Sequence, residues 1–165
     1  MNYCKYIPID VINGQGTRCT LFVAGCEHHC KGCYNQSTWN INSGFPFTEE
    51  LATQIITDLN DTRIHRRGLS ISGGDPLLPH NIPTVKALCE RVRAECSADK
   101  DIWMWTGYLK DELTPEQQEV VDLIDVLIDG KFVEKLRDVT LPFRGSRNQV
   151  IYRFNRAMAP WRQGK

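Results

Sequence analysis

Short apolar runs alternate with longer segments of helical periodicity along most of the chain. Runs rich in Val, Ile, Leu, Phe and Trp have the length and composition of buried strands, and they lie at residues 20–24, 69–72, 102–105 and 126–129. Strands that alternate with helices are typical of a parallel sheet whose strands are joined by crossover helices. The predicted fold class is therefore α/β.

The segments between these runs carry helix signals. Thr48 can cap a helix that reaches about Asn60. The next helix has an apolar stripe that consists of Ile82, Val85, Leu88, Cys89, Val92 and Cys96. A third helix is predicted after Thr114, because a proline at the first helical position and Gln117 complete a capping box there.

Each predicted strand runs into glycine, at Gly25, Gly73-Gly74, Gly107 and Gly130. Ligands of parallel sheets bind at the carboxyl ends of the strands, and glycine there lets the backbone approach a ligand closely. A single glycine is equally well explained as a turn residue. Because all four fall on one edge of the sheet, we expect them to border one site.

Length and composition indicate one globular domain of 165 residues, 41% of them hydrophobic, without linkers or repeats. We place its core at about residues 15–132 and a basic arm at about 133–165. From Lys131 onward nine Lys or Arg residues face two acidic residues, so this end carries about +7 and the rest about −7. Its aromatic residues Phe143, Tyr152, Phe154 and Trp161 would suit single-stranded nucleic acid, but the charges form no continuous stripe. A solvated or partner-docking arm is favoured.

The seven cysteines do not resemble a disulfide framework, because their number is odd and no leader sequence precedes them. We therefore expect a cytoplasmic protein, and no apolar run approaches the roughly 20 residues that a membrane span needs. Cys89 and Cys96 are interpreted as core residues of a helix, and Cys4 and Cys19 as ordinary thiols.

Cys26, Cys30 and Cys33 follow the first strand in the order Cys-three-Cys-two-Cys. Such spacing lets the sulfurs converge, and a [4Fe-4S] cluster held by only three thiolates keeps one iron open for a small molecule. A zinc site that uses His28 or His29 as the fourth ligand is the alternative, although the loop between the first two cysteines is short for one ion. Unligated thiols are the third interpretation, and the iron-sulfur one is favoured.

Together, the cysteine loop and the run Gly73-Gly74-Asp75-Pro76 resemble the radical S-adenosylmethionine superfamily. The likeness extends to one family within it, the proteins that activate anaerobic (class III) ribonucleoside-triphosphate reductases. The segments that carry this closer resemblance are residues 13–18, 33–39, 102–108, 129–131 and 144–149. Gln15, where proline is common, and Phe143, where tryptophan is expected, depart from the pattern.

The resemblance implies an incomplete, open parallel β/α barrel and an oxidoreductase. Cys26, Cys30 and Cys33 would hold the cluster, whose open iron chelates the methionine part of S-adenosylmethionine. Reductive cleavage then yields a 5′-deoxyadenosyl radical, which takes a hydrogen atom from a glycine of the reductase. The residues implied to bind the cofactor are Gly32, Cys33, Tyr34, Gly73, Gly74, Asp75, Gly130, Lys131 and Phe132. Asp75 would contact the methionine ammonium group, together with Gly73 and Gly74.

For some residues, simple packing competes with a role in the site. Core packing is as plausible as cofactor contact for Tyr34 and Phe132, and it is favoured for Trp103 and Trp105. By resemblance residues 13–18 lie near the entry of the partner's glycine loop, where Arg18 would anchor the contact. His28 and His29 would either tune the cluster or be solvated loop residues.

The resemblance also implies partners. We expect a stable hetero-oligomeric complex with the reductase, for which two copies of each chain is one arrangement, and a reduced flavodoxin-type electron donor. The alternatives are an activase of another glycyl-radical enzyme and a zinc-bearing protein-interaction module. Binding to nucleic acid or to a membrane is not expected.

Overall fold

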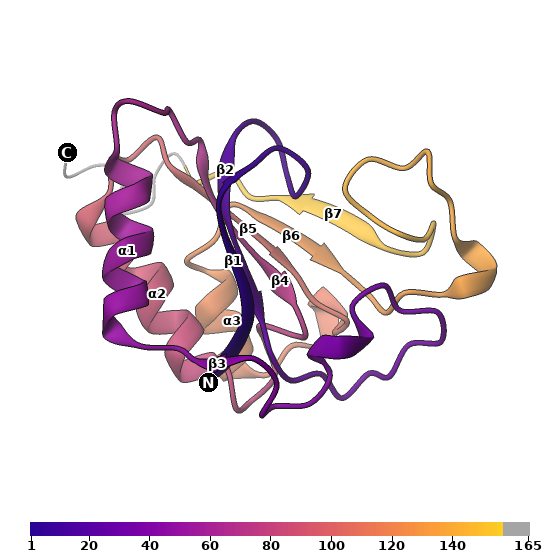
Figure 1. The fold of residues 1–165 in the computed structure, drawn as a ribbon. Helices are drawn as coiled ribbons and strands as arrows, with labels where there is room; N and C mark the ends of the chain where they lie inside the picture. Colours follow the sequence, from indigo (N-terminus) through magenta and orange to yellow (C-terminus); the bar gives the residue numbers. More distant parts are fainter. Residues whose placement is uncertain (157–165) are drawn as a thin grey trace.

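One seven-stranded sheet in the order β3-β1-β2-β4-β5-β6-β7 forms the centre of the molecule (Figure 1). Its strands are β1 (Asn2–Asp10), β2 (Arg18–Val23), β3 (Phe45–Pro46), β4 (Gly68–Gly73), β5 (Asp101–Trp105), β6 (Val126–Asp129) and β7 (Val150–Arg153). β2, β4, β5 and β6 pair in parallel, and the sheet is open, with β3 and β7 at its edges. The α/β class is confirmed. This computed structural model describes residues 1–156, so Trp161 and the last basic residues of the predicted arm lie outside it.

The three predicted helices are present with the predicted starts. They are α1 (Glu49–Asn60), α2 (Ile82–Glu95) and α3 (Pro115–Val121). The Thr48 hydroxyl accepts a hydrogen bond from the Leu51 backbone N–H. Thr114 and Gln117 form both bonds of the capping box, because the backbone N–H of each residue donates to the side-chain oxygen of the other. Short 3-10 helices lie at Gln36–Thr38, Lys110–Glu112 and Glu134–Leu136.

The two faces of the sheet are covered differently. All three α-helices lie on one face, whereas loops that follow β2 and β6 extend over the other (Figure 1). The main core lies between sheet and helices and includes alternate strand residues such as Leu21, Ile71, Met104 and Leu127, with Cys89 and Cys96 from the helical side. Core packing of these two cysteines is confirmed.

The opposite face carries a smaller cluster of Trp103, Val126 and Ile128, against which Trp105 and Phe143 pack. Because side chains alternate along a strand, Trp103 and Trp105 both point to this face while Met104 points to the helices. Trp103 is completely buried, which confirms its predicted role in packing.

Three strands were not predicted, and each joins the sheet antiparallel to its neighbour. β1 and β3 extend the sheet beyond β2, and β7 pairs with β6. Their side chains are mostly half-buried or exposed, so they lack the continuous apolar runs that mark the central parallel strands. β1 begins before residue 15 and β7 follows residue 132, so the sheet extends beyond the predicted core at both ends.

The part of the predicted basic arm that the structure describes, up to residue 156, packs onto the domain. The Arg156 guanidinium donates to the carbonyl oxygens of Val121 and Ile124 at 2.8 and 3.0 Å, and that of Arg153 lies 4.9 Å from the centre of the Trp103 ring. These cations are therefore used within the fold. Among residues 1–156, no helix combines the length and apolar character that crossing a membrane would require.

Candidate functional site

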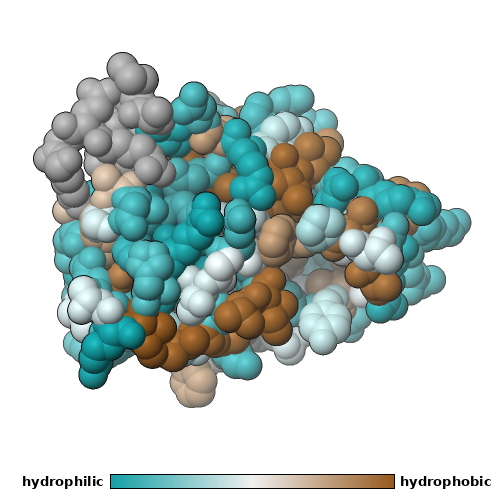
Figure 2. All heavy atoms as spheres, turned by 90° about the horizontal axis from the view of Figure 1, so that it is seen from above, coloured by the Kyte–Doolittle hydropathy of each residue, from teal (hydrophilic) through white to brown (hydrophobic). Residues whose placement is uncertain are grey.

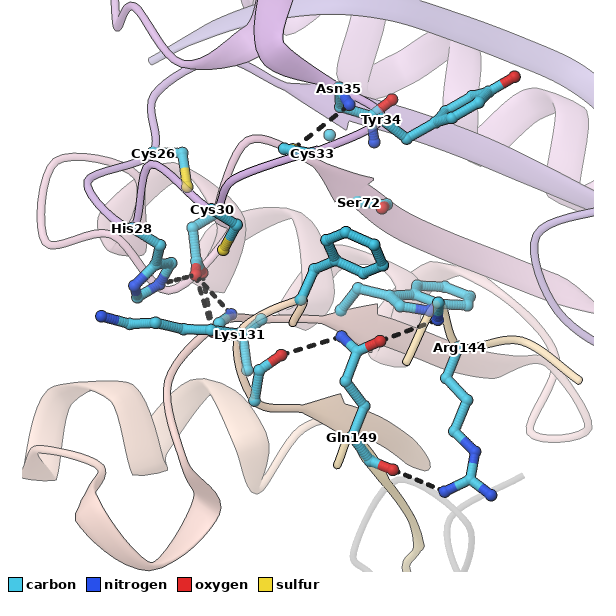
Figure 3. A pocket seen from close by; sticks show the side chains of 18 of the residues that line it. Cys26, His28, Cys30, Cys33, Tyr34, Asn35, Ser72, Lys131, Arg144 and Gln149 are labelled. Atoms are coloured by element: carbon cyan, nitrogen blue, oxygen red, sulfur yellow. Dashed lines mark hydrogen bonds and ion pairs between the residues drawn. The ribbon is translucent and has the colours of Figure 1, made fainter. Parts of the chain in front are cut away.

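The carboxyl ends of the parallel strands border a cavity of about 520 Å³. This volume lies within the range of about 300–1,000 Å³ that is typical of small-molecule sites. Its walls come from the cysteine loop after β2, from the ends of β4, β5 and β6, and from the long loop of residues 133–149 (Figure 3). The cavity therefore lies at the edge of the sheet that the glycines after the strands predicted.

Cys26, Cys30 and Cys33 all line this cavity. All three are free thiols and half-buried. The loop that carries them is held to the following segment, because the Gly25 and Cys26 amides donate to the Thr38 and Trp39 carbonyls at 2.7 and 3.0 Å. The structure thus brings the predicted ligands to one cavity without a disulfide between them.

One backbone amide acts on each of two of these sulfurs. The Asn35 N–H donates to Cys33 Sγ at 3.4 Å. Burial raises the pKa of the Cys26 thiol to about 11, and a hydrogen bond from the His28 backbone N–H acts in the opposite direction. Amide donors aimed at cysteine sulfurs are a common feature of iron-sulfur sites, where they stabilise negative charge on the ligands.

The donor set fits a cluster better than the zinc alternative. His28 bonds to Asp75 at 2.6 Å, and His29 packs edge-on against the Trp39 ring at 4.8 Å, so both histidines have other partners. A [4Fe-4S] cluster needs only a thiolate on each of three irons, and three open thiols on one cavity wall provide them.

Gly73 and Gly74 lie on the cavity wall at the end of β4. A Cβ on Gly73 would lie 2.7 Å from the Val23 backbone, and one on Gly74 would lie 2.8 Å from the Gly25 carbonyl carbon. Both residues are only half-buried. Glycine is therefore required for β4 to approach β2 at this point, and it leaves peptide groups facing the cavity.

Asp75 is placed at the site, but its side chain is not open to it. The residue is 0% exposed. Its carboxylate accepts from the Leu77 amide, the Thr106 hydroxyl and the Gly107 amide, each at 2.9 Å, and bonds to His28. The predicted contact between this carboxylate and an ammonium group of the ligand has no support in this arrangement. These bonds to the Asp75 carboxylate could not be predicted from the sequence alone.

The remaining predicted residues are distributed around the same cavity, which is lined by Gly32, Tyr34, Gly107, Gly130, Lys131 and Phe132. Gly25 is the exception among the strand-end glycines. It lies behind the wall, and its carbonyl accepts from the Asp75 amide at 2.7 Å.

Two aromatic residues differ from the packing interpretation. Tyr34 is 99% exposed at the rim, so its interpretation as a core residue is wrong. Trp105 packs with Trp103 as predicted but also lines the cavity, and its Nε1 donates to the Phe143 carbonyl at 2.7 Å. Phe132 is half-buried on the wall.

Arg18 does not face the site. It is buried at the opposite end of the strands, where its Nη1 lies 2.6 Å from Asp101 Oδ1 and its Nε donates to Ser70 Oγ at 2.7 Å. The predicted contact with a partner is therefore wrong. A buried guanidinium with several internal partners serves the fold instead.

The loop of residues 133–149 was not assigned to the site from the sequence. It contributes residues that include Arg137, Val139, Leu141 and Arg144 to the wall opposite the cysteine loop. Gln149 holds the end of this loop, since its Nε2 donates to the Gly130 carbonyl at 2.9 Å and its Oε1 accepts from the Gly145 amide at 2.8 Å (Figure 3). The run of residues 144–149, noted above only for the resemblance, was the available signal.

Comparisons with known proteins agree with this geometry. A family model described as a 4Fe-4S single cluster domain matches residues 12–152. The chain is 62% identical over 152 residues to the anaerobic ribonucleoside-triphosphate reductase-activating protein of Salmonella typhimurium, covering 92% of this chain and 98% of the relative. The protein of the same name from Vibrio cholerae is 60% identical over 154 residues, with 93% and 99% covered. That from Enterobacteria phage T4 is 42% identical over 152 residues, with 92% and 94% covered.

Proposed function

The chain belongs to the family of anaerobic ribonucleoside-triphosphate reductase-activating proteins, and from this premise we propose how its site performs the activation. Cys26, Cys30 and Cys33 hold one [4Fe-4S] cluster, and S-adenosylmethionine binds beside it in the cavity. When bound, these two groups supply the 5′-deoxyadenosyl radical that removes a hydrogen atom from a glycine of the reductase. The protein is thus a radical S-adenosylmethionine enzyme of the oxidoreductase class.

One observation carries this proposal: three free thiols of a single loop share a cavity with the glycine-rich ends of β4, β5 and β6. Three thiolates leave one iron of a cubane without a protein ligand. A cofactor placed against the strand ends is therefore also within reach of that iron. Neither feature alone would require a redox cofactor.

The backbone of Gly73 and Gly74 is the proposed support for the methionine end of the cofactor. This is a narrower assignment than the sequence prediction, because the Asp75 carboxylate is already hydrogen-bonded to four groups of the protein. We assign Asp75 the task of fixing the strand end so that the two glycine peptide groups face the cavity.

The adenosine end is proposed to lie between the cysteine loop and the end of β6. Gly32 and Tyr34 flank the last cysteine on one side, and Gly130, Lys131 and Phe132 border the other. The half-buried ring of Phe132 and the exposed ring of Tyr34 offer apolar surface to adenine.

The open sheet supports a protein substrate. We propose that the four parallel strands and their helices form an incomplete barrel of the radical S-adenosylmethionine type, and that the reductase covers its open side. Exposed apolar residues near the cavity mouth, Ile12 and Val139 among them, are 77% and 82% accessible in the chain alone. A covering partner would bury them and keep water from the radical. A complex with two copies of each chain and a flavodoxin-type electron donor belong to the same proposal.

The direct test combines the reduced protein, S-adenosylmethionine and an anaerobic ribonucleoside-triphosphate reductase without oxygen, and records the electron paramagnetic resonance (EPR) signal of a glycyl radical. We expect the signal with the wild type and none with Cys30→Ala. Cys89→Ala is the matched control, because this thiol is buried among the helices and should leave the signal intact. A glycyl radical formed with Cys30→Ala would contradict the cluster assignment. Activation of only some other glycyl-radical enzyme would contradict the assigned partner.

A further inference from the structure

His28 lies between the first two cysteines, yet its side chain is only 5% exposed. Its neighbour His29 is exposed in the same loop. The His28 Nε2 atom lies 2.6 Å from Asp75 Oδ2, and the Tyr108 ring packs edge-on against the imidazole at 4.5 Å. A polar loop side chain held this firmly needs a structural or functional reason.

Gly107 provides the space for this imidazole. A Cβ at position 107 would lie 2.6 Å from His28 Nε2 and 2.7 Å from Cγ, well inside contact distance. The Gly107 amide meanwhile donates to the carboxylate that His28 contacts, at 2.9 Å. The glycine at the end of β5 is thus matched to the histidine of the cysteine loop.

Asp75 is a rigid anchor for His28. Its other bonds come from Leu77 N, in the turn after β4, and from Thr106 Oγ1 and Gly107 N, directly after β5. Because the backbone fixes most of these donors, the carboxylate has little freedom to turn. The imidazole therefore connects the cysteine loop to two strand ends.

The backbone of His28 contacts a predicted cluster ligand. His28 lies two residues after Cys26 in the same loop, and its backbone N–H acts to lower the pKa of the Cys26 thiol against the effect of burial. Hydrogen bonds to cysteine sulfurs are one determinant of cluster reduction potentials, because a donor stabilises the additional negative charge of the reduced state. The position of this one peptide group therefore matters for electron transfer.

We propose that His28 is a positioning residue: its side chain, anchored on Asp75 in the space left by Gly107, holds its backbone N–H against the Cys26 sulfur and thereby raises the reduction potential of the cluster. This inference rests on the proposed function, since it requires the cluster on Cys26, Cys30 and Cys33. It assigns to the Asp75 carboxylate the support of a ligand loop.

The test measures the midpoint potential of the reconstituted cluster by an EPR-monitored redox titration. His28→Leu keeps the bulk but removes the bond to Asp75, and we expect about a tenfold lower ratio of reduced to oxidised cluster at fixed poise, which corresponds to about 59 mV. His28→Gln places an amide donor near the position of Nε2 and should restore most of the potential. Gly107→Ala, which displaces the ring without changing it, should shift the potential in the same direction as His28→Leu.

His29→Asn is the matched control. The residue has a positive φ of 47°, which asparagine tolerates, and its ring contacts only the Trp39 ring among the interactions described for it. It should retain the wild-type potential. An independent readout is amide hydrogen exchange in the metal-free protein, where the His28 N–H should exchange faster in His28→Leu and Gly107→Ala.

Iron content separates this inference from the proposed function. A wild-type protein that takes up no cluster would contradict the proposed function itself. Clusters with the wild-type potential in both His28→Leu and Gly107→Ala would overturn only the positioning role. If His28→Leu fails to retain iron, the Gly107→Ala and His28→Gln potentials decide, and two wild-type values would again refute the role.

Discussion

The two ends of the parallel strands each carry a carboxylate bonded to a basic side chain, and the surroundings of these two pairs differ. At the amino ends, Asp101 pairs with Arg18 under the start of the sheet. At the carboxyl ends, Asp75 bonds to His28 of the cysteine loop. Both acids also accept further bonds, Asp101 from the Trp103 indole of its own strand and Asp75 from the Thr106 hydroxyl after β5, so the two networks look alike as lists of contacts.

What surrounds the two networks sets them apart. The Arg18 guanidinium fills the amino end, with further bonds to Ser70 and the Leu69 carbonyl, and its Cζ lies 5.3 Å from the centre of the Trp103 ring. Around Asp75 the strand ends are glycines and the adjacent cavity is lined by free thiols. A carboxylate paired with a basic side chain is thus no indicator of a site by itself. The open space and unused chemical groups beside it distinguish the functional end.

The largest effect should come from breaking the amino-end pair. Arg18→Met removes a buried partner of Asp101 together with the bonds to Ser70 and the Leu69 carbonyl, while Arg67 still pairs with the carboxylate. The free energy of unfolding should therefore fall by about 3 kcal/mol, the lower end of the range for a broken buried pair. Urea denaturation of the metal-free protein measures the change. Arg63→Met, which removes an exposed pair with Asp61, should leave the free energy unchanged. If Arg18→Met were as stable as the wild type, the Arg18–Asp101 pair would not stabilise the fold, and this side of the comparison would be wrong.

A pair of glycine substitutions separates stability from binding. A Cβ on Gly68, at the amino end of β4, would lie 2.8 Å from the Asp101 carbonyl carbon, and one on Gly74 equally close to that of Gly25. Each alanine variant should lose about 1–3 kcal/mol of stability through overpacking. Only Gly74→Ala should also weaken S-adenosylmethionine binding, by at least tenfold in Kd, measured by calorimetry on the reconstituted protein.

If both glycine variants lost the same affinity for S-adenosylmethionine, the loss would come from a general change in the fold and not from a lost contact with the cofactor. That result would contradict the placement of the cofactor at the carboxyl ends of the strands. The comparison is sharpest if the two variants have similar urea midpoints, because their affinities can then be compared directly.

The sequence predicted the parallel half of the sheet and the helices well, since each of these elements is buried on the side that its pattern indicates. The strand β6 has the predicted bounds, and the caps at Thr48 and Thr114 are present. The three antiparallel strands were missed because their side chains are mostly half-buried or exposed and therefore form no continuous apolar run. Local signals such as caps are read within a few residues, whereas edge pairing depends on partners far along the chain.

The same difference between local and long-range features applies to the prediction of the site. The three cysteines and most of the glycines could be located from spacing and strand ends, because both are local features. The roles of Arg18 and Asp75 could not, since the partner of a charged side chain is decided by which distant residues the fold brings near it. The wall formed by residues 133–149 was missed for a similar reason, because an irregular loop has no periodicity.

The smallest predicted effect concerns the buried thiols, which belong to the packed part of the molecule. Burial raises the pKa of Cys19 to about 11 and that of Cys89 to about 12, against about 8.5 in an unfolded chain. The unfolded state therefore loses these protons first as the pH rises. Stability is retained below pH 8.5 and should fall above it, by up to about 1.4 kcal/mol per pH unit for each thiol.

Urea denaturation of the metal-free protein at pH 7.5 and 9.5 measures this slope. Cys89→Ala should make the slope shallower, whatever its effect on stability at pH 7.5. A slope identical to that of the wild type would show that this thiol does not stay protonated in the folded state.

The central claim is that three cysteines at the carboxyl end leave one iron of the cluster for S-adenosylmethionine. Electron-nuclear double resonance of the reduced protein with S-adenosylmethionine labelled with ¹⁵N at the methionine amino group tests it most directly. We predict a ¹⁵N hyperfine coupling to the cluster in the wild type that persists in Arg18→Met and is weakened or lost in Gly74→Ala. A reduced [4Fe-4S] cluster that shows no such coupling in the wild type would contradict the account.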